Sequence, residues 1–524
     1  MWKTHYDVLI VGAGVAGSAL AHALATLPRE KPLRIALLER SLAEPNRIVG
    51  ELLQPGGVSA LQELGLEACL ENIDAVHVKG YCVVTGDRSV HIPYPDTKEG
   101  RSFHHGRFIM NLRDAARRAA GVDIIEATVT GLVHRHFEER VIGVHALRKD
   151  GTTSGEDGEK ATFFADLVVV ADGCFSNFRT SVIGRTAGKA STRSHFVGLV
   201  LDNAPLPLQE HGTVVLTHDA GPVLLYQIAK HDTRMLIDVK HPVPSEADLK
   251  AHIRAKIVPQ LPLPLRCAVD AALAKDRLRR MPNSILPAVQ QGTAATPAGI
   301  LLLGDAWNMR HPLTGGGMTV ALNDVVLLRT LFGALPDFKD CAQTARAIRT
   351  WHWRRKPVAA TVNILSVALY DLFAGDDTDL AVLRTGCLGY LERGGACVSG
   401  PAALLSVVVP SPLLLAWHFF AVALYSIWLL FALPYATPGL RGKPREIAPS
   451  FDEYPRLFRR SVQVLNTACR VFLPLVYAEL RWWAPAPPPK PPAEPTFEMP
   501  VTLTVYIVWF VVPLVLWTLL LLYT

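Results

Sequence analysis

The N-terminal part of the chain alternates short apolar runs with turn residues and helical runs. Residues 6–11 form an apolar run, residues 12–17 read GAGVAG, and a helical pattern rich in alanine and leucine follows. Glycines at this spacing allow a tight turn, a close approach of the backbone to a phosphate, and close packing of helix on strand. A second apolar run, residues 33–38, ends at Glu39, where a carboxylate can bind ribose hydroxyls. The pattern predicts a unit of strand, helix and strand that binds a dinucleotide.

Two further apolar runs are each followed by a polar loop. Residues 167–170 lead into DGCFSNFR at 172–179, where Asp172 by itself is better explained as a helix cap in a turn. Residues 299–303 lead into GDAWNMRHPLTGGGM at 304–318, and a helical run follows at 319–331. A glycine turn at the start of a helix offers free backbone N–H groups and the positive end of the helix dipole. We therefore predict a site there for an electron-rich group.

Between these two loops the pattern changes to that of a sheet. Residues 213–217, 223–228 and 234–239 are short apolar runs separated by turn residues, which predicts a strand meander. Two proline-rich stretches, 259–264 and 281–287, are expected to carry the chain back toward the nucleotide-binding part. The second of them fits helical and extended structure equally.

The strongest hydrophobic segments lie near the C-terminal end. Residues 394–440 contain no Asp, Glu, Lys or Arg, and residues 411–433 are long enough to cross a membrane. Prolines bracket that stretch, so a span and a hairpin lying in one leaflet both remain open. Residues 500–524 are also uncharged and follow a proline-rich linker, which favours a membrane anchor over a buried soluble helix. Because the first apolar run lacks the pattern of a secretory signal, we expect membrane attachment at this end of the chain.

Composition and charge narrow the function further. The chain has 524 residues, 50% of them hydrophobic, and a formal net charge of +6. Because no basic tract with interleaved aromatic residues is present, we expect no nucleic acid partner. Basic residues cluster at 352–356, 441–445 and 456–460, which fits contact with anionic membrane lipid, although the first cluster fits a solvated helix face equally. The eight cysteines have no paired spacing, so we expect reduced thiols and no metal site.

The order of the three motifs GxGxxG, DG and GD resembles that of single-chain flavoprotein monooxygenases of the aromatic hydroxylase type, in which all three surround one FAD. Longer matches are RIVGELLQPGG at 47–57, FHHGRFIM at 103–110, SHFVG at 194–198, NMRHPLTGGGM at 308–318 and GGACVSGP at 394–401. These segments resemble the signatures of squalene monooxygenase, also called squalene epoxidase. The similarity covers nearly all of the chain up to about residue 480.

The resemblance implies an α/β fold with three parts: a Rossmann-like FAD-binding domain, an inserted β-sheet substrate domain, and a C-terminal membrane-associated helical region. The FAD-binding domain is expected at residues 1–75, 106–190 and 285–345, and the substrate domain at 76–105 and 191–284. The helical membrane-associated domain is expected at 346–480, a proline-rich linker at 481–498, and a transmembrane helix at 499–524.

The resemblance also implies a reaction, the FAD-dependent epoxidation of squalene by O2 to (S)-2,3-epoxysqualene in sterol biosynthesis, through a flavin C4a-hydroperoxide. The sequence shows no Ser-His-Asp order, zincin helix or haem motif, which agrees with chemistry carried by a cofactor. Only one dinucleotide fingerprint is present, so the electrons of NADPH are expected from a separate NADPH-cytochrome P450 reductase. The implied location is the endoplasmic reticulum membrane, with the catalytic domain on the cytosolic side.

Three other functions remain open at this point. A soluble aromatic hydroxylase would share the FAD motifs but would have no use for two membrane-length segments. A prenyl-lipid flavin reductase of the geranylgeranyl type would share the flavin fold and hydrogenate the alkene instead. A non-catalytic prenyl-lipid carrier on the same fold would not need intact DG and GD motifs.

The resemblance assigns roles to individual residues. Those expected to contact FAD are Gly12, Gly14, Val15, Ala16, Gly17, Glu39, Arg40, Arg47, Leu52, Arg113, Val129, Asp305 and Met318. Asp305 would accept hydrogen bonds from hydroxyls on the ribityl or pyrophosphate side, and residues 315–318 would face the flavin ring. Arg47 and Arg113 have an alternative explanation as solvent-exposed ion pairs.

Tyr81 and Gln54 are the predicted catalytic residues, because together they would form hydrogen bonds that orient the active site. Tyr81 is equally explained as an ordinary core tyrosine with a satisfied hydroxyl. His311 is expected to hold the turn of its loop rather than to act as an acid.

Overall fold

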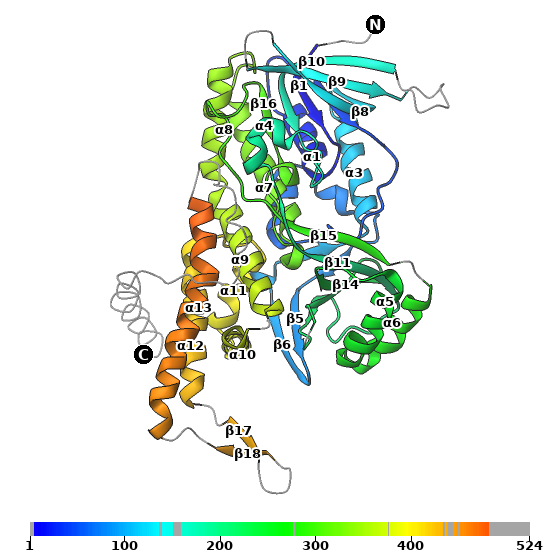
Figure 1. Cartoon of the computed structure of the whole chain (residues 1–524). Helices are drawn as coiled ribbons and strands as arrows, with labels where there is room; N and C mark the ends of the chain where they lie inside the picture. Colours follow the sequence, from blue (N-terminus) through cyan, green and yellow to red (C-terminus); the bar gives the residue numbers. More distant parts are fainter. Residues whose placement is uncertain are drawn as a thin grey trace.

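Two large sheets and a group of C-terminal helices make up the molecule (Figure 1). The computed structural model describes residues 5–135, 139–149, 159–218, 220–275, 278–375, 377–432, 435–438, 444–447 and 451–480. The expected linker at 481–498 and the expected membrane helix at 499–524 lie outside this part of the chain.

The first sheet contains the nucleotide-binding pattern. Its strands are β1 (His5–Val11), β2 (Ile35–Glu39), β8 (Val122–His134), β9 (Val141–Arg148), β10 (Glu159–Val170) and β16 (Ile300–Leu302). β1 pairs in parallel with β2 and β10, and β10 pairs in parallel with β16, so the carboxyl ends of these strands meet at one edge. The strands expected near residues 6–11, 33–38, 167–170 and 299–303 are therefore confirmed.

Helices pack around this sheet, and three of them begin at the loops that follow β1, β10 and β16. They are α1 (Val15–Ala25), α2 (Pro55–Glu63), α3 (His105–Arg118), α4 (Arg179–Ala187), α7 (Gly317–Gly333) and α8 (Cys341–Arg354). α1 packs against both α3 and α7, and its small residues Ala19, Ala21 and Ala23 are fully buried. The helix expected at 319–331 is confirmed as α7, which begins at the glycine turn itself.

The second sheet has the strand order β15-β11-β14-β13-β12-β5-β6. Its strands are β5 (Gly80–Thr85), β6 (Arg88–Pro93), β11 (Ser191–Asp202), β12 (His211–Val215), β13 (Val223–Gln227), β14 (Asp232–Lys240) and β15 (Arg279–Ile285). The predicted meander is thus confirmed. A small third sheet joins β3 (Leu52–Leu53), β7 (Gly100–Ser102) and β4 (Val76–Val78) beside it.

The two proline-rich stretches have different structures. The first leads into α6 (Leu263–Lys275), which packs on β11 together with α5 (Glu246–His252), so the expectation that it leads back to the cofactor domain is wrong. Pro264 fits there because proline is tolerated in the first turn of a helix. The second stretch is extended and forms most of β15, at the edge of the sheet.

Side chains on the second sheet alternate between its two faces, as the pleat requires. Tyr81 and Val83 face the C-terminal helices, whereas Cys82 and Val84 face α5 and α6. The C-terminal helices are α9 (Lys356–Ala374), α10 (Thr378–Glu392), α11 (Ala396–Leu405), α12 (Pro412–Ala432) and α13 (Tyr454–Leu480). One face of the sheet therefore lies against a helical layer, and this contact forms part of the site below.

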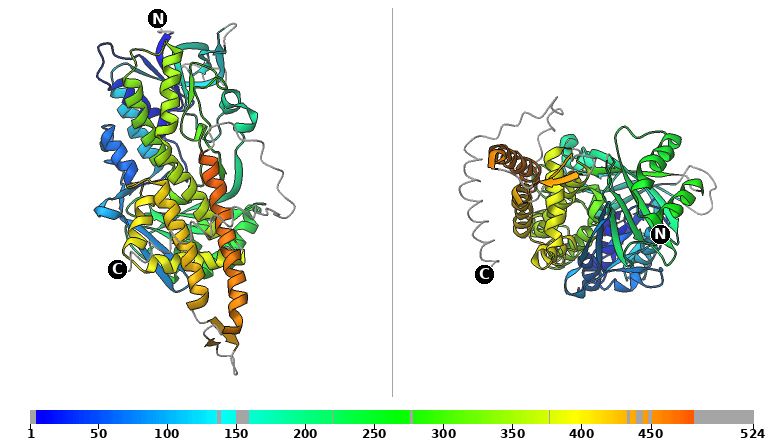
Figure 2. Two further views of the ribbon diagram at one scale, coloured as in Figure 1. Left: turned by 90° about the vertical axis from the view of Figure 1, so that its left-hand side faces the viewer. Right: turned by 90° about the horizontal axis from the view of Figure 1, so that it is seen from below.

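The helices α12 and α13 lie side by side and project beyond the rest of the molecule, with β17 (Tyr435–Pro438) and β18 (Pro444–Ile447) at their far end (Figure 2). By length and composition α9 and α12 could each cross a membrane, but 72% of the apolar window of α9 is buried against 28% for α12. α9 is therefore a core helix of this fold. The expected apolar segment at 411–433 forms one helix as far as it is described, and its exposed apolar surface is compatible with lipid.

The burial of His352 in α8 predicts that the stability of the folded protein falls in acid. The His352 ring is fully buried beside Trp307, and neither ring nitrogen has a partner among the described residues. Burial lowers the pKa of His352 to about 3. Below pH 6.5 the unfolded chain therefore binds a proton that the native chain does not, and stability falls with pH. We expect His352→Leu to leave the free energy of unfolding unchanged at pH 7.5 and to raise it by about 2 kcal/mol at pH 5. Parallel pH profiles of unfolding for the two proteins would contradict this.

Candidate functional site

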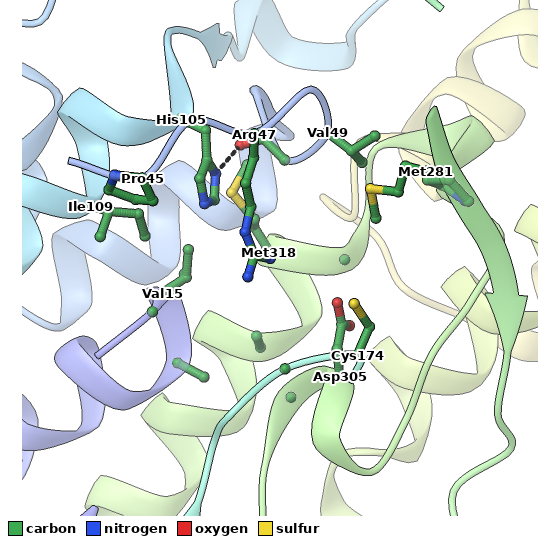
Figure 3. Close-up of a pocket in the computed structure, with 18 of the residues that line it drawn as sticks. Val15, Pro45, Arg47, Val49, His105, Ile109, Cys174, Met281, Asp305 and Met318 are labelled. Carbon is green, nitrogen blue, oxygen red and sulfur yellow. Dashed lines mark hydrogen bonds between the residues drawn. The ribbon is translucent and has the colours of Figure 1, made fainter. Parts of the chain in front are cut away.

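A cavity of about 670 Å³ lies where the carboxyl ends of the first sheet meet the second sheet. Figure 3 shows side chains from several elements pointing into it, among them Val15, Arg47, His105, Asp305 and Met318. The volume is within the range of about 300–1,000 Å³ that is typical of ligand and cofactor sites. All residues expected to contact FAD line this cavity except Gly17.

Each of the three glycines of the GxGxxG segment between β1 and α1 suits its position for a different reason. Gly12 has a φ of +101°, which residues with a side chain rarely adopt. A Cβ atom on Gly17 would lie 1.9 Å from the carbonyl oxygen of Gly12, so this glycine lets α1 pack on β1. A Cβ atom on Gly14 would meet no protein atom within 4 Å, so that position is open for a ligand.

Glu39 and Arg113 brace this turn from two sides. The Glu39 Oε2 atom accepts a hydrogen bond of 2.8 Å from the backbone N–H of Ala13, and Arg113 Nε donates one of 2.9 Å to the Ala13 carbonyl. Arg113 is buried, so its alternative explanation as a solvent-exposed ion pair is wrong. Arg47 is exposed, and its side chain points into the cavity (Figure 3).

The DG and GD loops are held together by one buried arginine. Arg179 donates to the carbonyl oxygens of Ala306 at 2.7 Å and of Asp305 and Cys174 at 2.9 Å. The N–H groups at the start of α4 bond to Ser176 Oγ, whereas Asp172 accepts from the N–H of Asn177. Asp172 therefore does not bond to the first turn of α4, and the Asp305 side chain points into the cavity (Figure 3).

The triple glycine at the start of α7 combines close packing with an open position. Gly315 has a φ of +63°, and a Cβ atom there would lie 2.9 Å from Leu52. A Cβ atom on Gly316 would lie 2.5 Å from Val362 of α9, whereas one on Gly317 would meet nothing within 4 Å. Gly317, the first residue of α7, therefore leaves its backbone open toward the cavity, as an anion or an electron-rich ring requires.

Two other polar side chains line this cavity, and the first of them suits a negatively charged cofactor. Arg310 is 9% exposed, and its Nε and Nη1 atoms have no partner in the described part of the chain. Burial lowers the pKa of Arg310 to about 10, so it stays positively charged at neutral pH. His105 donates from Nδ1 to the Gly50 carbonyl at 2.7 Å, and burial lowers its pKa to about 4, so it is neutral.

Gln54 and Tyr81 meet in the structure, together with Tyr94, which the sequence analysis did not single out. The Gln54 Nε2 atom donates to the Tyr81 hydroxyl and, at 2.7 Å, to the Thr314 carbonyl. The Tyr94 hydroxyl donates to Gln54 Oε1 at 2.6 Å, which fixes the orientation of the amide. Burial raises the pKa of Tyr81, so its hydroxyl keeps its proton. Tyr81 lines the cavity, whereas Gln54 lies behind it.

A second cavity, of about 130 Å³, adjoins the first. Its wall is almost entirely apolar and comes from the second sheet and from α9, α10, α11, α12 and α13. Tyr81, Val214 and Leu313 line both cavities, so these three residues form the partition between them. The arrangement places a polar, glycine-lined cavity next to a hydrocarbon-lined one.

His311 lies in the same loop and is fully buried. Its Nδ1 atom accepts from the N–H of Leu313 at 3.3 Å, which supports the turn at Pro312–Thr314. Burial lowers its pKa to about 3. The expectation that His311 holds the turn is confirmed.

Comparisons with known proteins agree with the geometry. The family model for squalene epoxidase matches residues 164–438. "Squalene epoxidase erg1" of Aspergillus fumigatus is 44% identical over 487 residues, which is 91% of this chain and 94% of that protein. "Squalene monooxygenase" of Mus musculus is 42% identical over 488 residues, which is 91% of this chain and 79% of that protein.

Solved structures share the fold at lower identity. The p-nitrophenol 4-monooxygenase PnpA from Pseudomonas putida DLL-E4 superposes with a TM-score of 0.62 and 17% identity, covering 78% of this chain and 98% of its own. PqsL, a probable FAD-dependent monooxygenase from Pseudomonas aeruginosa, gives a TM-score of 0.57 and 18% identity over 70% of this chain and 96% of its own.

Proposed function

The chain belongs to the squalene epoxidase family, and on that premise we propose that its two adjoining cavities hold FAD and the squalene chain on opposite sides of Tyr81, Val214 and Leu313. The activity itself is FAD-dependent epoxidation of squalene by O2. Membership of this family supports none of the three alternative functions, which were a prenyl reductase, a soluble hydroxylase and a non-catalytic carrier.

The shared partition is the observation that carries the proposal. A prenyl chain is hydrocarbon throughout, and its transfer from water into an apolar cavity is favourable by about 25 cal/mol for each Å² buried. The apolar cavity, of about 130 Å³, would hold one end of the chain and present its terminal alkene at the partition. The alkene then faces the FAD cavity across Tyr81, Val214 and Leu313.

Individual residues of the first cavity would hold the cofactor. Gly14 is open for the pyrophosphate, Glu39 lies at the end of β2 for the ribose, and Arg47 points inward as a cation (Figure 3). Asp305 would accept from hydroxyls of the sugar-like chain. The bare N-terminus of α7 at Gly317 would face the ring, where negative charge develops on reduction.

When bound, the flavin supplies the activation of O2. The protein positions the alkene, excludes water and provides hydrogen bonds at the partition. Gln54 already donates to the Tyr81 hydroxyl, so the Tyr81 proton is free to point toward the Thr314 carbonyl, 3.2 Å away, or toward a ligand. Tyr81 would thus act as the polar contact at the reacting end, with Gln54 and Tyr94 holding it.

Two further parts of the proposal concern the source of the electrons and the location of the protein in the cell. Electrons of NADPH would come from a separate NADPH-cytochrome P450 reductase. The protein would reside in the endoplasmic reticulum membrane with the catalytic part on the cytosolic side. Support for lipid contact comes from the projecting helices, on which Leu413, Trp428, Phe458, Tyr477 and Leu480 are exposed.

The function is tested with the purified full chain and squalene. With NADPH, the reductase and O2 we expect a product heavier than squalene by one oxygen atom. NADPH alone should reduce the flavin slowly. A product heavier by hydrogen and formed without O2 would favour a prenyl reductase, and rapid reduction by NADPH alone would refute the need for a partner.

Tyr81→Phe tests the role of the hydroxyl at the partition. We expect the epoxidation rate to fall about fivefold or more, in line with the loss of one hydrogen bond, while FAD affinity stays within about twofold. Tyr6→Phe is the matched control, because Tyr6 is also buried, in β1, and lines neither cavity. An epoxidation rate unchanged by Tyr81→Phe would rule out the assigned role.

A further inference from the structure

The last turns of α13 bury a carboxylate. Glu479 is 8% exposed and accepts hydrogen bonds of 2.8 Å from Lys356 Nζ and from Asn363 Nδ2, both on α9. Other side chains of α13, such as Phe458 and Tyr477, are exposed and apolar. The helix that projects from the molecule is therefore tied to α9 by a buried polar contact.

Asn363 continues this contact toward the proposed FAD site. Its Nδ2 atom also lies 3.3 Å from the Oδ1 atom of Asn308, in the loop between Asp305 and Gly315. Both neighbours, a carboxylate oxygen and an amide oxygen, are acceptors, so the amide of Asn363 can have only one orientation. The charge of Glu479 thereby sets the direction of the donor that reaches Asn308.

The side-chain oxygen of Asn308 accepts hydrogen bonds from three different side chains. Asn308 is 1% exposed, and its Oδ1 atom also accepts from Arg310 Nη2 at 2.9 Å and from Arg355 Nη2 at 3.1 Å. Arg355 in turn forms two hydrogen bonds with Asp324 of α7, at 2.7 and 2.8 Å. One oxygen atom thus connects the loop that carries Asp305 and Arg310 to α9, to the junction of α8 and α9 at Arg355 and, through Arg355, to α7.

We propose that Glu479 is a positioning residue for the 304–318 loop, acting on the cofactor site through Asn363 and Asn308. This inference rests on the proposed function, in which that loop holds FAD. Loss of the carboxylate charge leaves Lys356 buried without a counter-ion and frees the Asn363 amide to turn. Asn308 then loses a donor, and Arg310, at the cavity wall, loses the fixed position of its acceptor.

The test compares three variants of the full-length protein in FAD binding. Glu479→Gln removes the charge at constant shape. Asn363→Leu cuts the network in the middle and leaves the Lys356–Glu479 pair intact. Asp379→Asn is the matched control: Asp379 pairs with Arg460 of α13 at 3.0 Å and accepts from Thr467 at 3.2 Å, and neither contact leads to the loop.

We expect the first two variants to raise the dissociation constant of FAD about fivefold or more and to shift the absorbance band of the bound flavin, with the KM for squalene within about twofold. Asp379→Asn should bind FAD as the wild type does. Wild-type affinity in both Glu479→Gln and Asn363→Leu, or equal weakening by Asp379→Asn, would overturn the inference. A wild-type protein that binds no FAD would instead overturn the proposed function.

Discussion

Replacing Gly17 by alanine is expected to abolish FAD binding and to lower the unfolding temperature of the cofactor-free protein by several degrees. The added Cβ atom would lie 1.9 Å from the carbonyl oxygen of Gly12 and 3.3 Å from Ile10 of β1. Gly12 cannot move away easily, because its φ of +101° and the hydrogen bond from its N–H to the Leu38 carbonyl fix the turn. Overpacking of this kind typically costs about 1–3 kcal/mol. The strain is relieved only if α1 shifts, and a shift of α1 opens the glycine turn.

Gly14→Ala separates the two effects of that substitution. Its Cβ atom would meet no protein atom within 4 Å, so the cofactor-free protein should unfold at the wild-type temperature. FAD binding should nevertheless be lost, because the methyl group would occupy the space where the backbone approaches the pyrophosphate. Both variants are measured by thermal unfolding without FAD and by titration of FAD fluorescence. A stable Gly17→Ala protein, or a Gly14→Ala protein that binds FAD normally, would contradict the assigned roles.

The part of the fold built from local patterns could be predicted from the sequence. Alternating apolar runs and glycines give β1, α1 and β2, and the loop at 304–318 identifies the start of α7. Each of these signals is contained in a segment short enough for its hydrophobic period and its turn residues to be recognised together. The proline-rich stretch at 259–264 was misjudged, since proline in a first helical turn and proline in a link between domains have the same local pattern.

The partners of the site residues could not be predicted in the same way. Gln54 forms hydrogen bonds with Tyr94 and with the Thr314 carbonyl, and Glu479 forms one with Asn363. These partners lie far apart in the sequence, so no local hydrophobic pattern predicts their contact. Arg113 shows the same limit, because its burial depends on α3 packing over the glycine turn rather than on any neighbour in the sequence. The family resemblance supplied residue positions, whereas the structure supplies the contacts on which the predicted roles depend.

The buried pair of Glu51 and Arg234 is expected to give the largest loss of stability when it is broken. Glu51 is 1% exposed and Arg234 5%, and two hydrogen bonds of 2.7 and 2.8 Å join the carboxylate to the guanidinium. Glu51 precedes β3 in the loop that lines the first cavity, and Arg234 lies in β14 of the second sheet. The pair therefore fastens the proposed cofactor loop to the proposed substrate domain.

Arg234→Met should lower the free energy of unfolding by about 3–5 kcal/mol, because it leaves the Glu51 carboxylate buried and uncompensated. The double variant Glu51→Leu with Arg234→Met removes both charges and should recover much of this loss, since apolar side chains of similar size can replace a buried ion pair. Arg88→Met is the control: Arg88 and Glu392 pair at 2.6 Å with 53% and 38% of their side chains exposed, and its loss should cost less than about 1 kcal/mol. Urea unfolding of the cofactor-free proteins measures all three. If the double variant were as unstable as Arg234→Met alone, the loss would come from packing at β14 and not from the stranded charge.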